Sequence, residues 1–244
     1  FSVRPDAVTR VWTVEAKITF DPVAAPLRIS MAIPTTTPGY RIESAPVPYP
    51  GYRFHTGYED GSYRAVWEAE EGMKVPQTLY WRFLVYDTAW QPEVAVDSEE
   101  PAPTLPENEL SSLQQAAAQH LLEELQAQHP HSDWIPALFE ELNREPPSAD
   151  VAALLPVRRT PEQILYGARQ VLALAGIPSR ISLGLRLSDT RHHLTPEPRL
   201  EAFLDGNWQI YHPSSGRPGV EQGFILFRRG GDSLIDVEGG ENCR

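Results

Sequence analysis

The sequence predicts an α+β protein, in which an N-terminal antiparallel β-sandwich precedes a second domain of helices and antiparallel strands. Three observations indicate this. The first hundred residues alternate apolar and polar side chains, a proline-rich acidic stretch interrupts them, and helical patterns followed by hairpin patterns come after it. We therefore expect a β-sandwich domain over residues 1–105 and an α+β domain over residues 106–244.

The strands of the first domain are predicted from their period of two. In WTVEAKITF, apolar residues occupy every second position from Trp12 to Phe20, so one face is buried and the other is solvated. LRISMAI at 27–33 and SYRAVWEA at 62–69 show the same alternation. TLYWRFLVY, at 78–86, is apolar on both faces, which is typical of a central strand.

The domain boundary is predicted at Val94 to Glu109. This stretch holds three prolines and five acidic residues, and neither a strand nor a packed helix accommodates that composition. Few contacts should cross it, so the two halves should fold as separate units.

Three helices are predicted after the boundary, over 111–128, 134–142 and from Thr160 onward. The third carries the clearest signals, because Thr160 can cap it, Pro161 suits the first helical position, and Gln163 completes a capping box. Gly176 and Pro178 then end it.

The remaining strands are predicted from alternation and turn chemistry. ISLGLRL at 181–187 alternates, and RLEAFLDGNWQIYHP at 199–213 predicts a hairpin whose Asp205-Gly206 turn suits type I′. FILFRRGGDSLIDV, at 224–237, predicts a last hairpin that closes the same sheet. Trp208 follows the Asp205-Gly206 turn, and we expect it in the core, against the facing helix.

Composition excludes several classes of function. The net charge of −12 argues against a nucleic-acid partner, because phosphate binding needs clustered Lys and Arg. The single cysteine, Cys243, provides neither a disulfide framework nor a thiolate metal site, and we expect no cofactor. No apolar run approaches a membrane span, and the start at Phe1 without Met suggests excision from a longer protein.

The order of these parts resembles a known family. A helix ending in GIPSR, a strand with Gly184 and the hairpin LEAFLDGNWQIYHPSSG are similar to the transglutaminase-like core of papain-type cysteine enzymes, over Leu113 to Phe227. In that family the helix carries a nucleophilic cysteine in its first turn, the next strand opens with a histidine, and a further strand ends in Asp-Pro.

The resemblance places the three catalytic positions on residues that do not support the chemistry. The nucleophile position falls at Pro161, with Thr160 and Glu162 as its neighbours, the histidine position at Glu197 and the aspartate position at His212. Proline has no nucleophile, glutamate does not replace an imidazole as the base, and histidine does not orient one as an anion. We therefore expect no catalysis.

This pattern resembles the group described as inactive transglutaminase fused to seven transmembrane helices. The resemblance implies an extracytoplasmic (periplasmic) portion of a bacterial inner-membrane protein, with its own transmembrane region and an ATP-grasp peptide-ligase-like protein as partners. We expect a non-catalytic module that binds or senses a peptide-like ligand or a protein partner. Its site would be the groove between the third helix and the sheet that carries Glu197 and His212.

Several side chains have two interpretations. Arg180 either binds an anionic ligand or anchors the helix–strand corner. Glu197 and His212 either share a charge-assisted bond across neighbouring strands or point into solvent. Thr160 or Ser214 would be a substitute nucleophile only beside a base, and the sequence indicates none.

Two other functions stay open. The first is a rewired metal-assisted hydrolase using the His192, His193 and His212 region, with Glu197 as a further ligand. Adjacent histidines on an extended chain point to opposite sides, which argues against it. The second is a purely structural assembly module.

Overall fold

The computed structural model describes residues 10–21, 26–34, 37, 39–45, 49–59, 61–71, 77–87, 103–129, 134–190, 193–231 and 233–239. The chain forms two compact units. The first comprises residues 1–100, 184–196 and 223–244, and the second comprises residues 101–183 and 197–222. After leaving the first unit, the chain thus returns to it twice. The sequence suggested two consecutive domains, 1–105 and 106–244, and this division stays a prediction.

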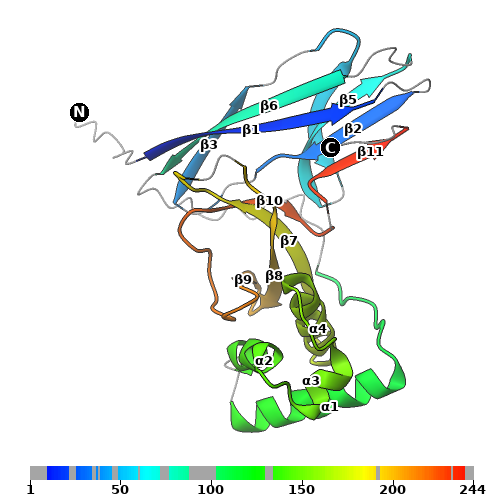
Figure 1. Ribbon diagram of the computed structural model, residues 1–244, viewed down its shortest axis with the longest axis vertical. Coiled ribbons are helices and arrows are strands. Elements are labelled where there is room, and N and C mark those ends of the chain that lie inside the picture. The colour runs from blue at the N-terminus through cyan, green and yellow to red at the C-terminus, as the bar shows by residue number, and fades with distance from the viewer. Residues whose placement is uncertain are drawn as a thin grey trace. The chain divides into compact units, whose positions relative to one another are not determined.

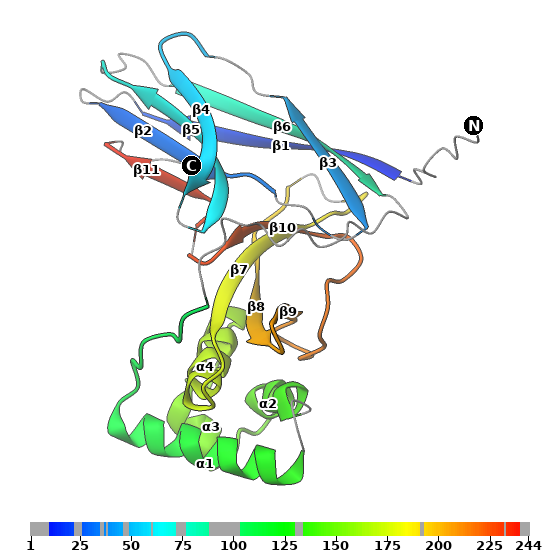
Figure 2. The same ribbon diagram turned by 180° about the vertical axis from the view of Figure 1, so that it is seen from behind.

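The first unit contains a three-stranded and a four-stranded antiparallel sheet (Figures 1 and 2). The three-stranded sheet has the order β1-β6-β3 and the four-stranded sheet the order β11-β2-β5-β4. Strand β6 is central in its sheet, as predicted. The strands are β1 (Arg10–Phe20), β2 (Leu27–Ala32), β3 (Tyr40–Ala45), β4 (Arg53–Glu59), β5 (Ser62–Ala69), β6 (Gln77–Asp87) and β11 (Ile235–Glu238).

The core of the first unit follows from the alternation. Ile18 and Phe20 of β1 and Trp81 and Phe83 of β6 are buried, whereas Tyr80, between the buried positions of β6, is exposed. Trp67 of β5 packs edge-on against Trp81, with ring centroids 5.8 Å apart. The β-sandwich predicted for the N-terminal region is present.

The predicted hairpin over 224–237 is wrong. Strand β10 (Phe224–Arg229) pairs in the sheet of β7, whereas β11 pairs with β2, with Ile235 opposite Met31. The physical reason lies in Asp236, whose Oδ2 is 2.6 Å from buried Arg64 and 3.0 Å from Arg228. Arg64 and Arg228 have guanidinium groups of low exposure and need a carboxylate partner. The pairing of β11 with β2 places Asp236 where it provides this carboxylate.

Among the described residues, the second unit contains four helices: α1 (Ser112–Gln128), α2 (Trp134–Asn143), α3 (Ala149–Leu154) and α4 (Pro161–Leu174). The capping box of Thr160 and Gln163 is present, with Pro161 in the first turn. Gly176 has φ 74°, and Ile177 N donates to Leu172 O, so the helix ends as predicted. Helix α3, begun by the Ser148 cap, is an element that the sequence reading missed.

The helices meet a four-stranded sheet of order β10-β7-β8-β9, with β7 (Ser179–Arg186), β8 (Glu197–Leu204) and β9 (Asn207–Tyr211). Asp205 and Gly206 have φ 51° and 81°, as a type I′ turn requires. Leu200 and Ala202 of β8 are buried in one core with Leu165, Ala168 and Val171 of α4. This packing fixes β8 on α4.

Candidate functional site

Strand β8 has one apolar and one charged face. Leu200 and Ala202 belong to the helical core, so the alternation of side chains places Glu197, Arg199 and Glu201 on the opposite face. Arg199 and Glu201 are nevertheless buried. Buried charges need partners, and the partners of these residues define the site.

The register of β8 and β9 brings His212 to the same face. Leu200 pairs with Tyr211, so one further step sets His212 opposite Arg199. Tyr211 faces the helical core, where its ring stacks on Phe139 at 6.1 Å. Burial raises the pKa of Tyr211 to about 12, so its phenol stays protonated near neutral pH.

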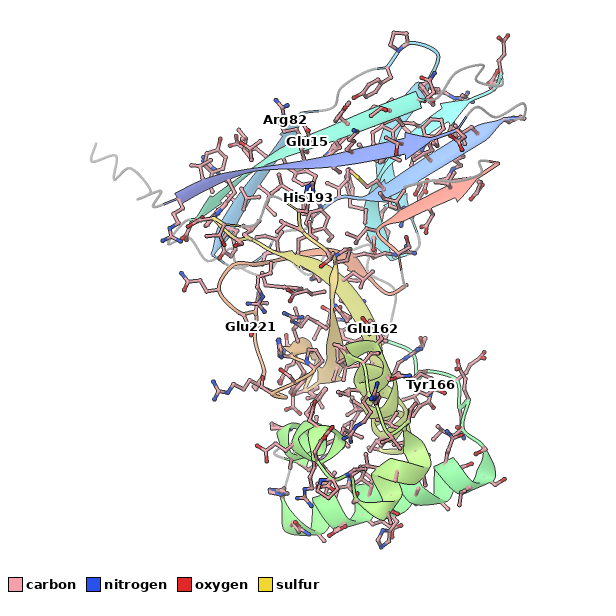
Figure 3. The ribbon with its side chains drawn as sticks, viewed as in Figure 1. Glu15, Arg82, Glu162, Tyr166, His193 and Glu221 are labelled. Carbon is pink, nitrogen blue, oxygen red and sulfur yellow. The ribbon has the colours of Figure 1, made fainter. Side chains whose placement is uncertain are left out.

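Four side chains form what we call the β8–β9 charge network: Glu197, Arg199, His212 and Glu221. Arg199 is 3% exposed, and its Nη2 lies 2.9 Å from Oε2 of Glu197 and 2.9 Å from Oε2 of Glu221. His212 Nε2 lies 3.6 Å from the same Glu221 oxygen. Figure 3 labels Glu221, which lies in the loop between β9 and β10. Glu197 and His212, for which the sequence left open a shared bond or exposure to solvent, are thus linked through Arg199 and Glu221.

His212 also closes the turn that follows it. Its Nδ1 accepts from the backbone N–H of Ser214 at 3.2 Å and lies 2.9 Å from Ser214 Oγ. The sequence indicated no base beside Ser214, and the structure corrects this. Both contacts join residues two apart, as in side-chain turn motifs, and they hold the ring in one orientation.

Arg180 forms a neighbouring cluster. Its Nε lies 2.7 Å from Oε2 of buried Glu201, to which the Ser182 hydroxyl also donates, and its guanidinium stacks 3.9 Å from the Trp208 ring. The structure therefore supports the anchoring role. Trp208 packs edge-on against Phe203 and is half-buried, so its expected place in the core was wrong.

Thr160 and Pro161 lie at the exposed start of α4. Thr160 Oγ1 accepts from Gln163 N at 3.3 Å, which engages the hydroxyl in capping. The preceding Arg159 donates to Leu142 O, and Asn143 of the same helix end donates to Pro213 O. The end of α2 therefore binds both the start of α4 and the turn after His212.

The expected groove between the third helix and the sheet is filled. The sheet side that faces α4 carries Leu200, Ala202 and Tyr211, all buried together with Ile164 and Leu172. Glu197 lies on the other face of β8. Any binding surface that uses Glu197 and His212 is therefore on the face turned away from the helical core.

The alternative histidine site is only partly described. His192 lies outside the described residues, and His193 is exposed and belongs to the first unit, whereas Glu197 and His212 belong to the second. Among the described residues, the group whose ligand atoms lie close enough for a metal is a different one, considered below.

The fold and this arrangement define a transglutaminase-like α+β protein. A similar solved structure is that of a candidate cysteine protease from Cytophaga hutchinsonii, with a TM-score of 0.53 and 12% identity over 96% of this chain and 91% of that one. This likeness concerns the fold. No curated protein matches the chain significantly.

The family follows from the sequence match. A family model described as inactive transglutaminase fused to 7 transmembrane helices matches residues 1–158, and the chain belongs to this family of membrane proteins. The matched stretch ends before Thr160, so it does not include Thr160, Pro161, Arg180, Glu197 or His212. Within the described residues, no helix has the length and apolar character to cross a membrane.

Proposed function

We propose that the protein is a non-catalytic recognition module that binds an extended peptide-like ligand or a segment of a protein partner. Its family is one of inactive transglutaminases. The observation that carries the proposal is the β8–β9 charge network, in which Glu197 and His212, at the expected catalytic positions, are tied to Arg199 and Glu221. The imidazole of His212, held by Glu221 and by Ser214, positions the turn that follows it and does not act as the base or orienting group of a thiol nucleophile.

The replacement of the nucleophile supports the same conclusion. Pro161 has no nucleophilic atom and fixes the first turn of α4. Its neighbour Thr160 uses its hydroxyl as a helix cap. We therefore assign Pro161, Glu197 and His212 structural roles in a site that has lost its reaction.

Strand β9 offers the binding surface. It is the last strand of its sheet, and an extended peptide can add to such an edge through main-chain hydrogen bonds. Gly219 N already donates to Ile210 O, so this loop covers one end of the edge. Trp208, half-buried and stacked by Arg180, lies on the part nearer the turn and would contact ligand side chains.

Selection from a random heptapeptide library displayed on phage tests this proposal. We expect the wild-type chain to enrich a sequence class that Trp208→Ala fails to retain, because the aromatic platform and the Arg180 stack are lost together. Tyr63→Ala is the matched control, since it removes an exposed aromatic residue from β5 of the other unit. Peptides retained equally by Trp208→Ala, or no enrichment at all, would overturn the proposal.

We also propose the cellular setting that the family suggests. The recognition surface would lie on the periplasmic side of a bacterial inner membrane, where peptide-like material is exposed, and an ATP-grasp peptide-ligase-like protein would be a partner. Labelling of a cysteine placed at exposed Asn207 by a membrane-impermeant maleimide in intact spheroplasts tests the side. Absence of labelling until the spheroplasts are lysed would refute it.

A further inference from the structure

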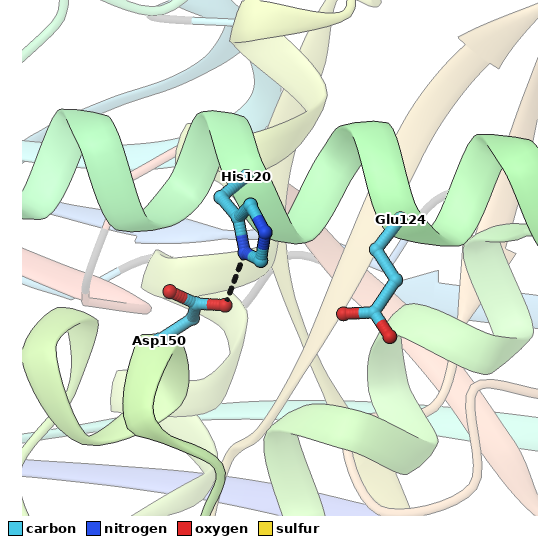
Figure 4. A group of neighbouring side chains, drawn as sticks. All are labelled: His120, Glu124 and Asp150. Atoms are coloured by element: carbon cyan, nitrogen blue, oxygen red, sulfur yellow. Dashed lines mark hydrogen bonds and ion pairs between the residues drawn. The ribbon is translucent and has the colours of Figure 1, made fainter.

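A cluster of metal-ligating side chains lies between α1 and α3, in the second unit and apart from the site described above. His120 and Glu124 are one helical turn apart on α1, and Asp150 is in the first turn of α3. Their ligand atoms all lie within 4.8 Å of one another. Figure 4 shows His120 and Glu124 projecting from the same side of α1, with Asp150 bonded to the imidazole.

The two helices that carry these groups are held together by their own packing. Leu121 and Leu122 of α1 and Val151 and Leu154 of α3 are buried in one core. Gln114 of the α1 capping box also donates to Leu154 O at 3.3 Å. The two helices are therefore held side by side without an ion, so that ion binding would require movement of side chains but not of the helices.

The distance between two of the donors is somewhat shorter than a bound zinc ion requires. His120 Nδ1 and Asp150 Oδ2 are 2.7 Å apart, and two donors at about 2.1 Å from a tetrahedral zinc lie roughly 3.4 Å apart. A small outward shift of the two side chains would admit the ion. Glu124 Oε1 accepts from Gln128 Nε2 at 3.1 Å, and a carboxylate oxygen has further lone-pair sites for an ion.

We propose that His120, Glu124 and Asp150 form a zinc site that clasps α1 to α3. Imidazole and carboxylate donors suit Zn²⁺, and the exposure of His120 leaves further coordination positions open to water or to a donor from a partner. Zinc takes the place of the proton that His120 shares with Asp150. The neighbouring charges, Asp150, Glu123 and Glu124, are all negative and favour a cation.

Competition between the full-length chain and a chromophoric chelator for Zn²⁺ tests the proposal. All proteins carry Cys243→Ser, so that no thiol contributes. We expect one zinc per chain, and an affinity at least tenfold weaker in His120→Ala and in Asp150→Asn. His55→Ala is the matched control, because His55 is exposed and pairs with Glu59 at 3.8 Å in the described structure.

Two further readouts separate ligation from folding. Circular dichroism without metal should be unchanged in His120→Ala, since this side chain is 69% exposed. The zinc affinity should fall about tenfold per pH unit below the pKa of His120, because the ion displaces a proton. Wild-type stoichiometry and affinity in His120→Ala, or an equal loss in His55→Ala, would overturn the site, as would failure of the wild-type chain to compete for zinc.

Discussion

Replacing Arg199 by methionine tests whether the β8–β9 charge network stabilises the site. The change removes a guanidinium that is 3% exposed and bonds Glu197 and Glu221 at 2.9 Å each. Each such charged hydrogen bond contributes about 1.5–3 kcal/mol. The buried guanidinium also costs desolvation energy, which methionine removes, and the two freed carboxylates are partly solvated. We therefore expect a net loss of about 2 kcal/mol in the free energy of unfolding.

Urea-induced unfolding at pH 7, followed by far-UV circular dichroism, measures this loss. Arg82→Met is the matched control, because Arg82 bonds Glu15 at 2.8 Å on an exposed strand face, where a pair contributes about 0.5 kcal/mol (Figure 3). The double variant Arg199→Met/Glu221→Gln should lose clearly less than the sum of its two single variants. Equal losses in Arg199→Met and Arg82→Met, or additive losses in the double variant, would show that the β8–β9 charge network does not stabilise the fold.

Three further predictions concern local structure. Thr160→Ala should lower the free energy of unfolding by about 1 kcal/mol, because a helix cap is removed; urea unfolding checks it, and no loss would contradict the capping role. Gly184→Ala should lower the free energy of unfolding by about 3 kcal/mol or more, since the new Cβ would lie 2.3 Å from Phe224 Cζ and 2.4 Å from Ile225 O. Gly57→Ala is the control, because a Cβ there meets nothing within 4 Å. Equal effects in the two variants would exclude this steric cause. The pKa of His120 should lie above its ordinary value of 6.5, because the protonated ring donates a hydrogen bond to Asp150. The stabilisation from this pair is therefore complete below pH 6.5 and is lost as the pH rises through the raised pKa. NMR titration should show the pKa falling in Asp150→Asn, and an unchanged pKa would contradict the contact.

Local signals in the sequence predicted much of the second unit. The capping box at Thr160 and the turn at Asp205-Gly206 are properties of four or fewer consecutive residues, so they are readable without the fold. The pairing of β11 with β2 was not readable, because it joins residues about two hundred positions apart and depends on the partners of Asp236.

The sequence singled out two members of the β8–β9 charge network but not the contacts between them. The resemblance indicated Glu197 and His212, and the structure places both in one network. Their connection through Arg199 and Glu221 was missed, because Glu221 lies in a loop whose position the sequence pattern does not specify. Alternation along β8 was the available signal for the correct face: Leu200 and Ala202 are its apolar positions, so Glu197 had to lie opposite them.

We expect this transglutaminase-like chain to have no catalytic activity. The most direct measurement incubates the purified chain with a glutamine-donor peptide and a fluorescent amine, and in parallel with a peptide library for hydrolysis. We expect no amine incorporation and no cleavage above the buffer blank, and no change in His212→Ala or Ser214→Ala. Turnover by the wild-type chain that either substitution abolishes would contradict it, because His212 and Ser214 would then be acting as base and nucleophile.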